Sequence, residues 1–161
     1  MIVSNTSPLI ALAKVDLLSL LQSLFEEVRI PPAVHRELLA KTGEDAARLD
    51  RALKHFIVVA PAPASTSPAQ ERVTQGIGEG EGQAVLLARE LGSLLLIDER
   101  AGRTAARRLG VPVTGTVGVL IRAKEIKLVT NIVPTLHEMR REGYWLSDHL
   151  IELAARHDDE G

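Results

Sequence analysis

The chain has 161 residues and a formal net charge of −2 at pH 7, so its length suits one domain and its overall charge offers no general attraction to nucleic acid. Hydrophobic residues make up 45% of the sequence and aromatic residues only 2%, which predicts an aliphatic core and argues against aromatic platforms for base stacking. The absence of cysteine excludes disulfides, thiol catalysis and thiolate metal sites. Any metal must therefore be bound by oxygen or histidine.

The first third of the chain alternates short apolar runs with helical patterns. A buried strand is predicted over residues 2–5, and a helix opens at Ser7-Pro8. Asp16 is expected to be the N-cap of a second helix. A strand over residues 28–30 stops at two prolines, and Pro32 suits the first position of the next helix. Residues 44–54 read as an exposed helix.

The rest of the chain continues the alternation. We expect strands at 56–59, 94–97 and 111–114, a surface loop at 60–69, and helices at 81–91, 100–109, 116–124, 133–142 and 147–156. This order predicts an α/β protein, with a central parallel sheet of four to five strands and helices on both faces in three α/β/α layers. Residues 1–161 are expected to be a single domain, with a core over 1–124 and C-terminal helices over 130–157. Without a leader signature or a long apolar run, a cytoplasmic location is expected.

Polar residues that follow apolar strands are the first candidates for chemistry, because parallel sheets bind ligands at the carboxyl ends of their strands. Residues 4–7 follow the first strand, and Asp98-Glu99 follows residues 94–97. A metal would offset the cost of burying an acid there, although Asp98 could simply cap the helix that begins near Arg100. The glycine-rich segment 76–82 lacks the features of a phosphate-binding loop. Its Glu81 would either interact with a helix dipole or bind a metal.

Five stretches carry a resemblance to a known family: VSNTSPLI at 3–10, IPPAV at 30–34 with EL at 37–38, GEGEGQA at 78–84, LIDERAGR at 96–103, and VTGTVGVL at 113–120. Together they resemble the PIN-domain ribonucleases, and in particular a prokaryotic branch similar to the virulence-associated protein C toxins of type II toxin–antitoxin pairs. The resemblance implies a PIN-like fold and an endoribonuclease that depends on Mg²⁺ or Mn²⁺. It also implies RNA and a cognate antitoxin protein as partners, and a homodimer.

The family's acidic cluster maps by position onto Asn5, Glu37, Glu81 and Asp98 as catalytic and metal-binding residues, and Glu99 is a further candidate ligand. Carboxylates of this kind hold divalent ions that activate water and stabilise the phosphate in an in-line displacement. The remaining candidates are expected to contact substrate: Arg100 and Arg103 on phosphates, and Thr6 and Ser7 near the metal-bound water. For Thr6, Ser7 and Glu99, hydrogen bonding and helix capping are equally good readings. The arginines have the alternative of forming a solvated basic face or pairing with an antitoxin.

Asn5 departs from the family pattern, in which Asp is usual. A neutral amide can still coordinate through its oxygen, but one negative charge is lost. Either Glu99 or Glu79 compensates, or the protein is a catalytically impaired PIN domain that binds a protein or RNA. A doubly wound phosphoacceptor domain is a weaker alternative. Tyr144-Trp145 could contact RNA or a partner, or belong to packing or a dimer interface.

Overall fold

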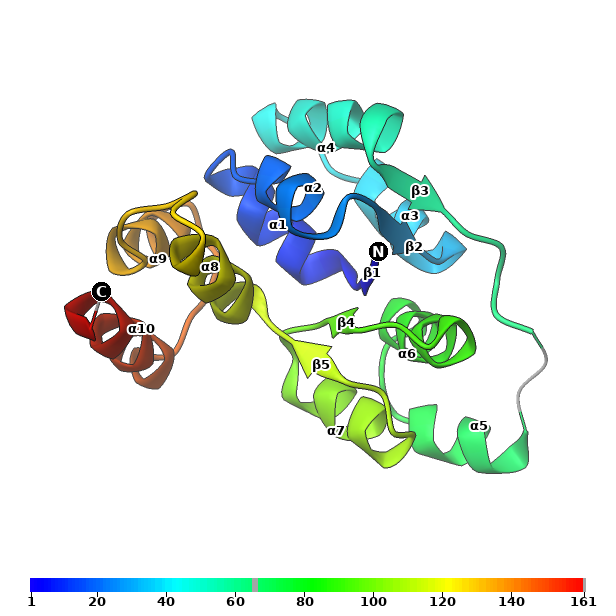
Figure 1. Ribbon diagram of the computed structural model, residues 1–161. Coiled ribbons are helices and arrows are strands. Elements are labelled where there is room, and N and C mark those ends of the chain that lie inside the picture. Colours follow the sequence, from blue (N-terminus) through cyan, green and yellow to red (C-terminus); the bar gives the residue numbers. More distant parts are fainter. Residues whose placement is uncertain (65–66, 161) are drawn as a thin grey trace.

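A sheet of parallel strands in the order β3-β2-β1-β4-β5 organises the described residues, which are 1–64 and 67–160 of this computed structural model (Figure 1). The strands are short and their registers place β1 between β2 and β4. Their bounds are β1 Ile2–Ser4, β2 Val28–Ile30, β3 Ile57–Val59, β4 Leu95–Leu96 and β5 Val113–Thr114. The predicted α/β fold with a parallel sheet of four to five strands is confirmed.

Helices cover both faces of this sheet, as the sequence predicts (Figure 1). Their bounds are α1 Thr6–Lys14, α2 Ser19–Phe25, α3 Pro32–Leu39, α4 Glu44–His55, α5 Pro68–Thr74, α6 Glu79–Leu91, α7 Arg100–Arg108, α8 Thr116–Glu125, α9 Val133–Arg141 and α10 Asp148–Glu160.

The predicted loop 60–69 is too long at its C-terminal end, because α5 already begins at Pro68. Ser67 caps this helix: its hydroxyl accepts from the Gln70 N–H at 3.2 Å, and the Gln70 side chain accepts from the Ser67 N–H at 3.1 Å. Residues 65 and 66 of the predicted loop lie outside the described part of the chain. The Ser-Pro-x-Gln pattern is the signal that marks the start of this helix.

Alternating side chains on the strands build two separate cores. Ile2 and Leu96 belong to a large core with α1, α2, α4, α8 and α9, whereas Val3 and Leu95 belong to a smaller core with α6 and α7. Successive residues of a strand point to opposite faces, so one buried strand supplies both cores. The near-continuous apolar strands of the sequence follow from this double burial.

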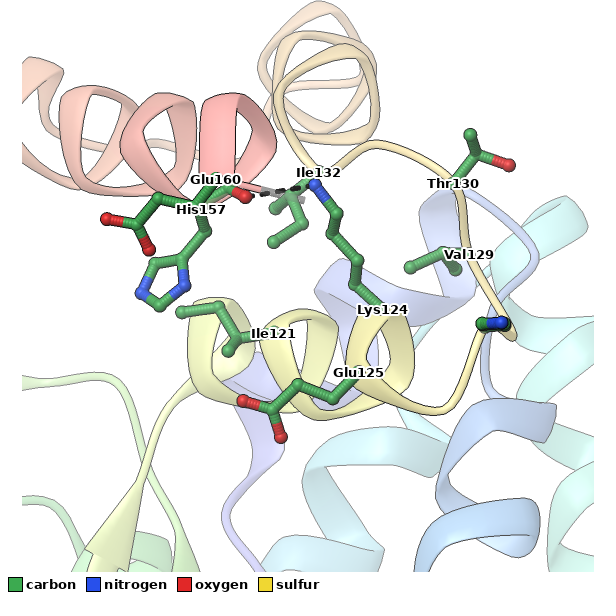
Figure 2. Close-up of a pocket in the computed structure, with 9 residues that line it drawn as sticks. Ile121, Lys124, Glu125, Val129, Thr130, Ile132, His157 and Glu160 are labelled. Atoms are coloured by element: carbon green, nitrogen blue, oxygen red, sulfur yellow. Dashed lines mark hydrogen bonds between the residues drawn. The ribbon is translucent and has the colours of Figure 1, made fainter.

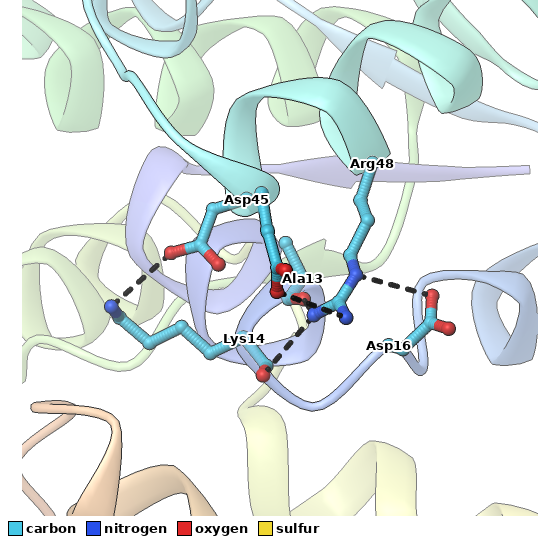
Figure 3. A network of polar contacts seen from close by, with 6 residues as sticks. Ala13, Lys14, Asp16, Asp45 and Arg48 are labelled. Atoms are coloured by element: carbon cyan, nitrogen blue, oxygen red, sulfur yellow. Dashed lines mark hydrogen bonds and ion pairs between the residues drawn. The ribbon is translucent and has the colours of Figure 1, made fainter.

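Asp16 is not the N-cap of the second helix, which begins at Ser19. Asp16 instead has a φ of +55° and closes the end of α1: its N–H donates to the Ala13 carbonyl, and the Leu17 N–H donates to the Leu12 carbonyl. This is the Schellman pattern of a helix C-terminus. Figure 3 shows the surrounding network, in which Arg48 of α4 donates to the Ala13 carbonyl at 2.8 Å and pairs with Asp16 at 3.6 Å. The aspartate therefore helps join α1 to α4.

A half-buried ion pair between Lys124 and Asp158 fastens the C-terminal helix to the helices before it. The Asp158 carboxylate accepts from the backbone N–H groups of Ile132 and Val133 at the start of α9, and from Lys124 at 3.2 Å. Burial alone would raise the pKa of Asp158, but the hydrogen bonds from Val133, Ile132 and Lys124 outweigh it and place the pKa below its ordinary value. Lys124 also donates to the His157 carbonyl at 3.0 Å, across a pocket between α8 and α10 (Figure 2).

The apolar N-terminal helices are internal to the fold. Most of α1, including Leu9, Ala11 and Leu12, is fully buried. Within the described residues, no single helix is long and apolar enough to cross a membrane; α1 and α2 would pass such a test only together, and the chain bends by 120° between them.

Candidate functional site

The connections of the sheet change direction between β1 and β4, which lie side by side. The chain runs from β1 through β2 to β3 on one side, and β4 and β5 follow on the other. Such a switch point leaves a crevice at the carboxyl ends of the two strands. Asn5 directly follows β1, and its N–H donates to the Leu96 carbonyl of β4 at 3.0 Å. The fold therefore brings Asn5 to the same edge as Asp98 and Glu99.

Glu99 is held by two polar side chains from the start of α1. The Asn5 amide donates to one Glu99 carboxylate oxygen at 3.1 Å, and the Ser7 hydroxyl donates to the other. Asn5 and Glu99 occupy the N-cap positions of α1 and α7, yet neither side chain caps its own helix. Asn5 is only 3% exposed, so this amide–carboxylate bond is an internal feature of the site. The N-termini of both helices also favour the negative charge of Glu99.

Glu81 lies in the first turn of α6, close to two other acids. Burial, and then the negative charges of Glu99 and Glu37, raise its pKa above the ordinary value of 4.5. Two glycines allow the approach of these side chains. A Cβ on Gly80 would collide with the Glu37 carboxylate, and a Cβ on Gly102 would lie 3.0 Å from a Glu81 carboxylate oxygen. We call Glu37, Glu81 and Glu99 the acidic cluster.

Asp98 is directed away from the start of α7 and caps a different helix. One of its oxygens accepts from the Thr116 N–H at 2.8 Å, and the other accepts from the Thr116 hydroxyl at 2.6 Å. Thr116 is the first residue of α8, so the reading of Asp98 as a cap for the helix near Arg100 is wrong. The Tyr144 hydroxyl also donates to Asp98. Burial and the Asp98 charge raise the pKa of Tyr144 far above its ordinary range, which keeps this hydroxyl protonated.

Two of the predicted substrate-contacting arginines lie beside these acids. Arg100 and Arg103 line a cleft of about 790 Å³ together with Ser7, Asp98 and Glu99. Arg103 is half-buried and donates to the Ile97 carbonyl at 3.1 Å, whereas Arg100 is exposed. These residues form the polar part of the cleft lining.

The other predicted residues have distinct surroundings. Thr6 is 6% exposed, and its hydroxyl has no hydrogen-bond partner among the described residues. Glu79, one of the two acids expected to replace the missing charge of Asn5, forms an exposed ion pair with Arg36 at 2.9 Å. Glu99, the other, contacts Asn5 directly.

Two residues that contact Asp98 were missed by sequence reasoning. Thr116 follows β5, so the rule that directs attention to strand ends would have found it if applied to that strand. Tyr144 lies 46 residues after Asp98 in the chain, and no local pattern indicates their contact. The sequence suggests for Tyr144 only a contact with RNA or a partner, or a place in packing or a dimer interface.

The donor set can be compared with what a divalent ion requires. Among the described residues, no three or more His, Asp or Glu side chains are already arranged to hold a metal ion. The chemistry nevertheless suits Mg²⁺ or Mn²⁺, because the available donors are carboxylate, amide and hydroxyl oxygens. Burial and the charges of Glu99 and Glu37 both disfavour the ionised form of Glu81, and a bound cation would offset these costs.

The fold and this site define a class of proteins: parallel α/β domains with carboxylates collected at the switch point of the sheet. A family model described as a PIN domain matches residues 1–160. The chain therefore belongs to the PIN-domain family and has a nuclease-type fold. No curated protein matches it.

Proposed function

We propose that the chain is a metal-dependent endoribonuclease that hydrolyses RNA phosphodiester bonds. The observation that carries this proposal is the acidic cluster, in which burial, and then the charges of Glu99 and Glu37, raise the pKa of Glu81. A structural role alone gives no reason to place three carboxylates where they repel one another. Membership of the PIN-domain family supports a nuclease function for the chain.

In this proposal Glu37, Glu81 and Glu99 hold the ion, and Asn5 and Asp98 complete its surroundings. The Asn5 amide donates through its nitrogen to Glu99, which leaves its oxygen available as a neutral donor. Bound Mg²⁺ or Mn²⁺ would supply an activated water and offset the negative charge of the phosphate.

The side chains around the acids have roles of their own in the proposed reaction. Arg100 and Arg103 bind the phosphates that flank the scissile bond. Ser7 orients Glu99, and the buried Thr6 hydroxyl is a donor for the attacking water. Together these groups position the RNA backbone over the acids, so that no covalent nucleophile is needed.

Calorimetric titration with Mn²⁺ tests the proposed site before any RNA is known. We expect wild type to bind Mn²⁺ and Glu99→Gln to bind it at least about tenfold more weakly, because a charged donor is lost. Glu79→Gln is the matched control, since it removes an acid from the start of α6 outside the acidic cluster. The same three proteins are then assayed for cleavage of RNA in Mn²⁺. Equal binding by wild type and Glu99→Gln would remove the cluster as the metal site.

A second candidate function rests on Asn5. Its neutral amide is bonded to Glu99, and the described acids are not already arranged around an ion. A catalytically impaired PIN domain that binds RNA or a protein would have these features. Asn5→Asp separates the two functions: an impaired site gains Mn²⁺ binding and RNA cleavage from the added charge, whereas an active site changes its rate only modestly.

We further propose that residues 1–161 act as one PIN-like domain, as a homodimer, and as the toxin of a type II toxin–antitoxin pair in the cytoplasm. Expression of the wild-type chain in a bacterial host should then arrest growth, and expression of Glu99→Gln should not. Co-expression of the cognate antitoxin should restore growth. Normal growth on expression of the wild type, with the protein folded, would contradict the toxin role.

A further inference from the structure

The cleft beside the acids has a second, apolar part whose role the proposed reaction does not explain. Side chains from α8 and the C-terminal segment form it, namely Val117, Ile121, Leu146, Leu150, Leu153 and Trp145. The polar and apolar parts share one space of about 790 Å³. This volume is within the range of sites for small ligands and is sufficient for a nucleotide.

Trp145 is the most exposed large apolar side chain in this part of the molecule. It is 81% exposed, so the core gains little from its ring. An indole placed in water is most easily understood as a surface for a ligand or a partner. Because the chain contains only one tryptophan, this ring is also a unique spectroscopic reporter of the cleft.

The residues on either side of Trp145 are fixed, although Trp145 itself is not. Tyr144 donates its hydroxyl to Asp98 and its N–H to the Met139 carbonyl at 2.9 Å. Leu146 is buried, and its carbonyl accepts from the Arg140 guanidinium at 3.0 Å. The segment is thus tied directly to the carboxylate at the end of β4. The backbone at Trp145 is therefore anchored beside the acids, so binding a ligand has to order little more than the indole side chain.

We propose that Trp145 and the apolar part of the cleft form a base-binding subsite for one unpaired nucleotide next to the phosphate that is cleaved. The inference rests on the proposed ribonuclease function and assigns the substrate feature that the site recognises. The lining matches the two halves of a nucleotide, because Arg100 and Arg103 suit its phosphate and the indole suits the flat face of its base.

A base buried in a duplex cannot stack on a protein side chain, so the subsite selects unpaired RNA. The low aromatic content of the sequence argues against a row of stacking platforms. A single ring in this position is sufficient for one base. A protein partner would also cover an exposed tryptophan and pair with the two arginines. We favour RNA because a nucleotide also explains why the arginines share one cleft with the proposed metal-binding acids.

Fluorescence of Trp145 tests the subsite directly. We would titrate the wild-type protein with a six-nucleotide single-stranded RNA, with Ca²⁺ in place of Mn²⁺ to prevent cleavage. We expect saturable quenching by this RNA, and none by a duplex of the same length or by an abasic strand that has only ribose and phosphate. Equal quenching by the abasic strand would overturn the proposal, because phosphate alone would then explain the response.

Cleavage kinetics separate this inference from the proposed function. We expect Trp145→Ala to lower kcat/KM for single-stranded RNA by at least about fivefold, the lower limit for loss of one stacked base. Trp145→Phe should retain most of the activity, and the abasic strand should be cleaved equally by all three proteins. Ile126→Ala, which truncates another exposed apolar side chain outside the cleft, is the control for surface effects.

The possible results distinguish the base-binding subsite from the ribonuclease function. If wild type cleaves RNA and Trp145→Ala cleaves it equally well, the subsite is wrong and the ribonuclease function stands. If Trp145→Ala instead loses dimerisation with unchanged cleavage, the occupant is a second copy of the chain and the inference fails. If wild type neither binds nor cleaves RNA, both proposals fail together.

Discussion

Neutralising Glu81 should stabilise the protein while it weakens metal binding. The Glu81 carboxylate is partly buried beside Glu99 and Glu37, so its charged form is disfavoured in the absence of a cation. Glu81→Gln keeps the shape of the side chain and removes the repulsion. The same change also removes a favourable interaction with the N-terminus of α6, worth about 0.3–1 kcal/mol, so the comparison needs a reference at the same helix end.

Glu79→Gln provides that reference. Both glutamates lie in the first turn of α6, but Glu79 is exposed and pairs with Arg36. The helix-end contribution cancels in the difference between the two variants. What remains is the relief of repulsion in Glu81→Gln and the loss of the surface ion pair with Arg36 in Glu79→Gln, each about 0.2–1 kcal/mol. We therefore expect Glu81→Gln to be more stable than Glu79→Gln by about 1 kcal/mol, or about 2–4 °C in Tm for a chain of this size.

Thermal unfolding with and without Mn²⁺ completes the test. At an ion concentration about ten times the Kd, binding should stabilise wild type and Glu79→Gln by about 1.4 kcal/mol. Glu81→Gln should gain much less. If Glu81→Gln is the less stable variant without metal, the repulsion inferred from the acidic cluster is wrong. If it gains as much from Mn²⁺ as wild type, Glu81 is not a ligand.

Three further changes have outcomes set by single contacts. Asp158→Asn should lower the free energy of unfolding by about 1–3 kcal/mol at pH 7 in urea titrations. The pKa of Asp158 is lowered in the folded state, so the charged side chain stabilises the protein fully above the ordinary pKa of 3.8. The difference between wild type and Asp158→Asn should therefore shrink as the pH falls below 3.8. Tyr144→Phe keeps the ring but removes one charged hydrogen bond to Asp98, and should cost about 1–3 kcal/mol in the same assay. Asn5→Asp replaces the hydrogen bond from the Asn5 amide to Glu99 by a contact between two carboxylates, so it should destabilise the metal-free protein by about 1–3 kcal/mol. Mn²⁺ should restore the lost stability, which thermal unfolding with and without the ion would show.

The fold was predictable because its main determinants are local. Apolar runs bounded by prolines and polar residues define β1 and β2, and the regular alternation with helices implies a parallel sheet. Local signals also failed where a competing motif was present. Asp16 resembles an N-cap in the sequence, but in the structure it has a positive φ and ends the helix before it. The capping box at Ser67 was overlooked inside a stretch rich in proline and serine.

The candidate site was predictable only in part. The strand-end rule brought Asn5, Asp98 and Glu99 together from sequence, because parallel strands share an edge. The rule could not say which of these residues belongs to the acidic cluster and which caps another helix. Glu99 lies between Asn5 and Glu81, whereas Asp98 is engaged by Thr116 and by Tyr144, and this division depends on side-chain directions that the spacing of residues does not encode. The contact from Tyr144 depends on how the C-terminal segment returns to the sheet.

The three hydrogen bonds to Asp98 determine how an inactive form of this protein should be made. Replacing this aspartate would remove the cap of α8 and release the segment that carries Trp145, in addition to any loss of chemistry. A loss of activity in such a mutant would therefore be ambiguous between catalysis and architecture. Glu37, an exposed side chain that approaches the other acids over Gly80, offers a cleaner knockout. Inactivated protein for binding studies or co-crystals is better prepared at that position.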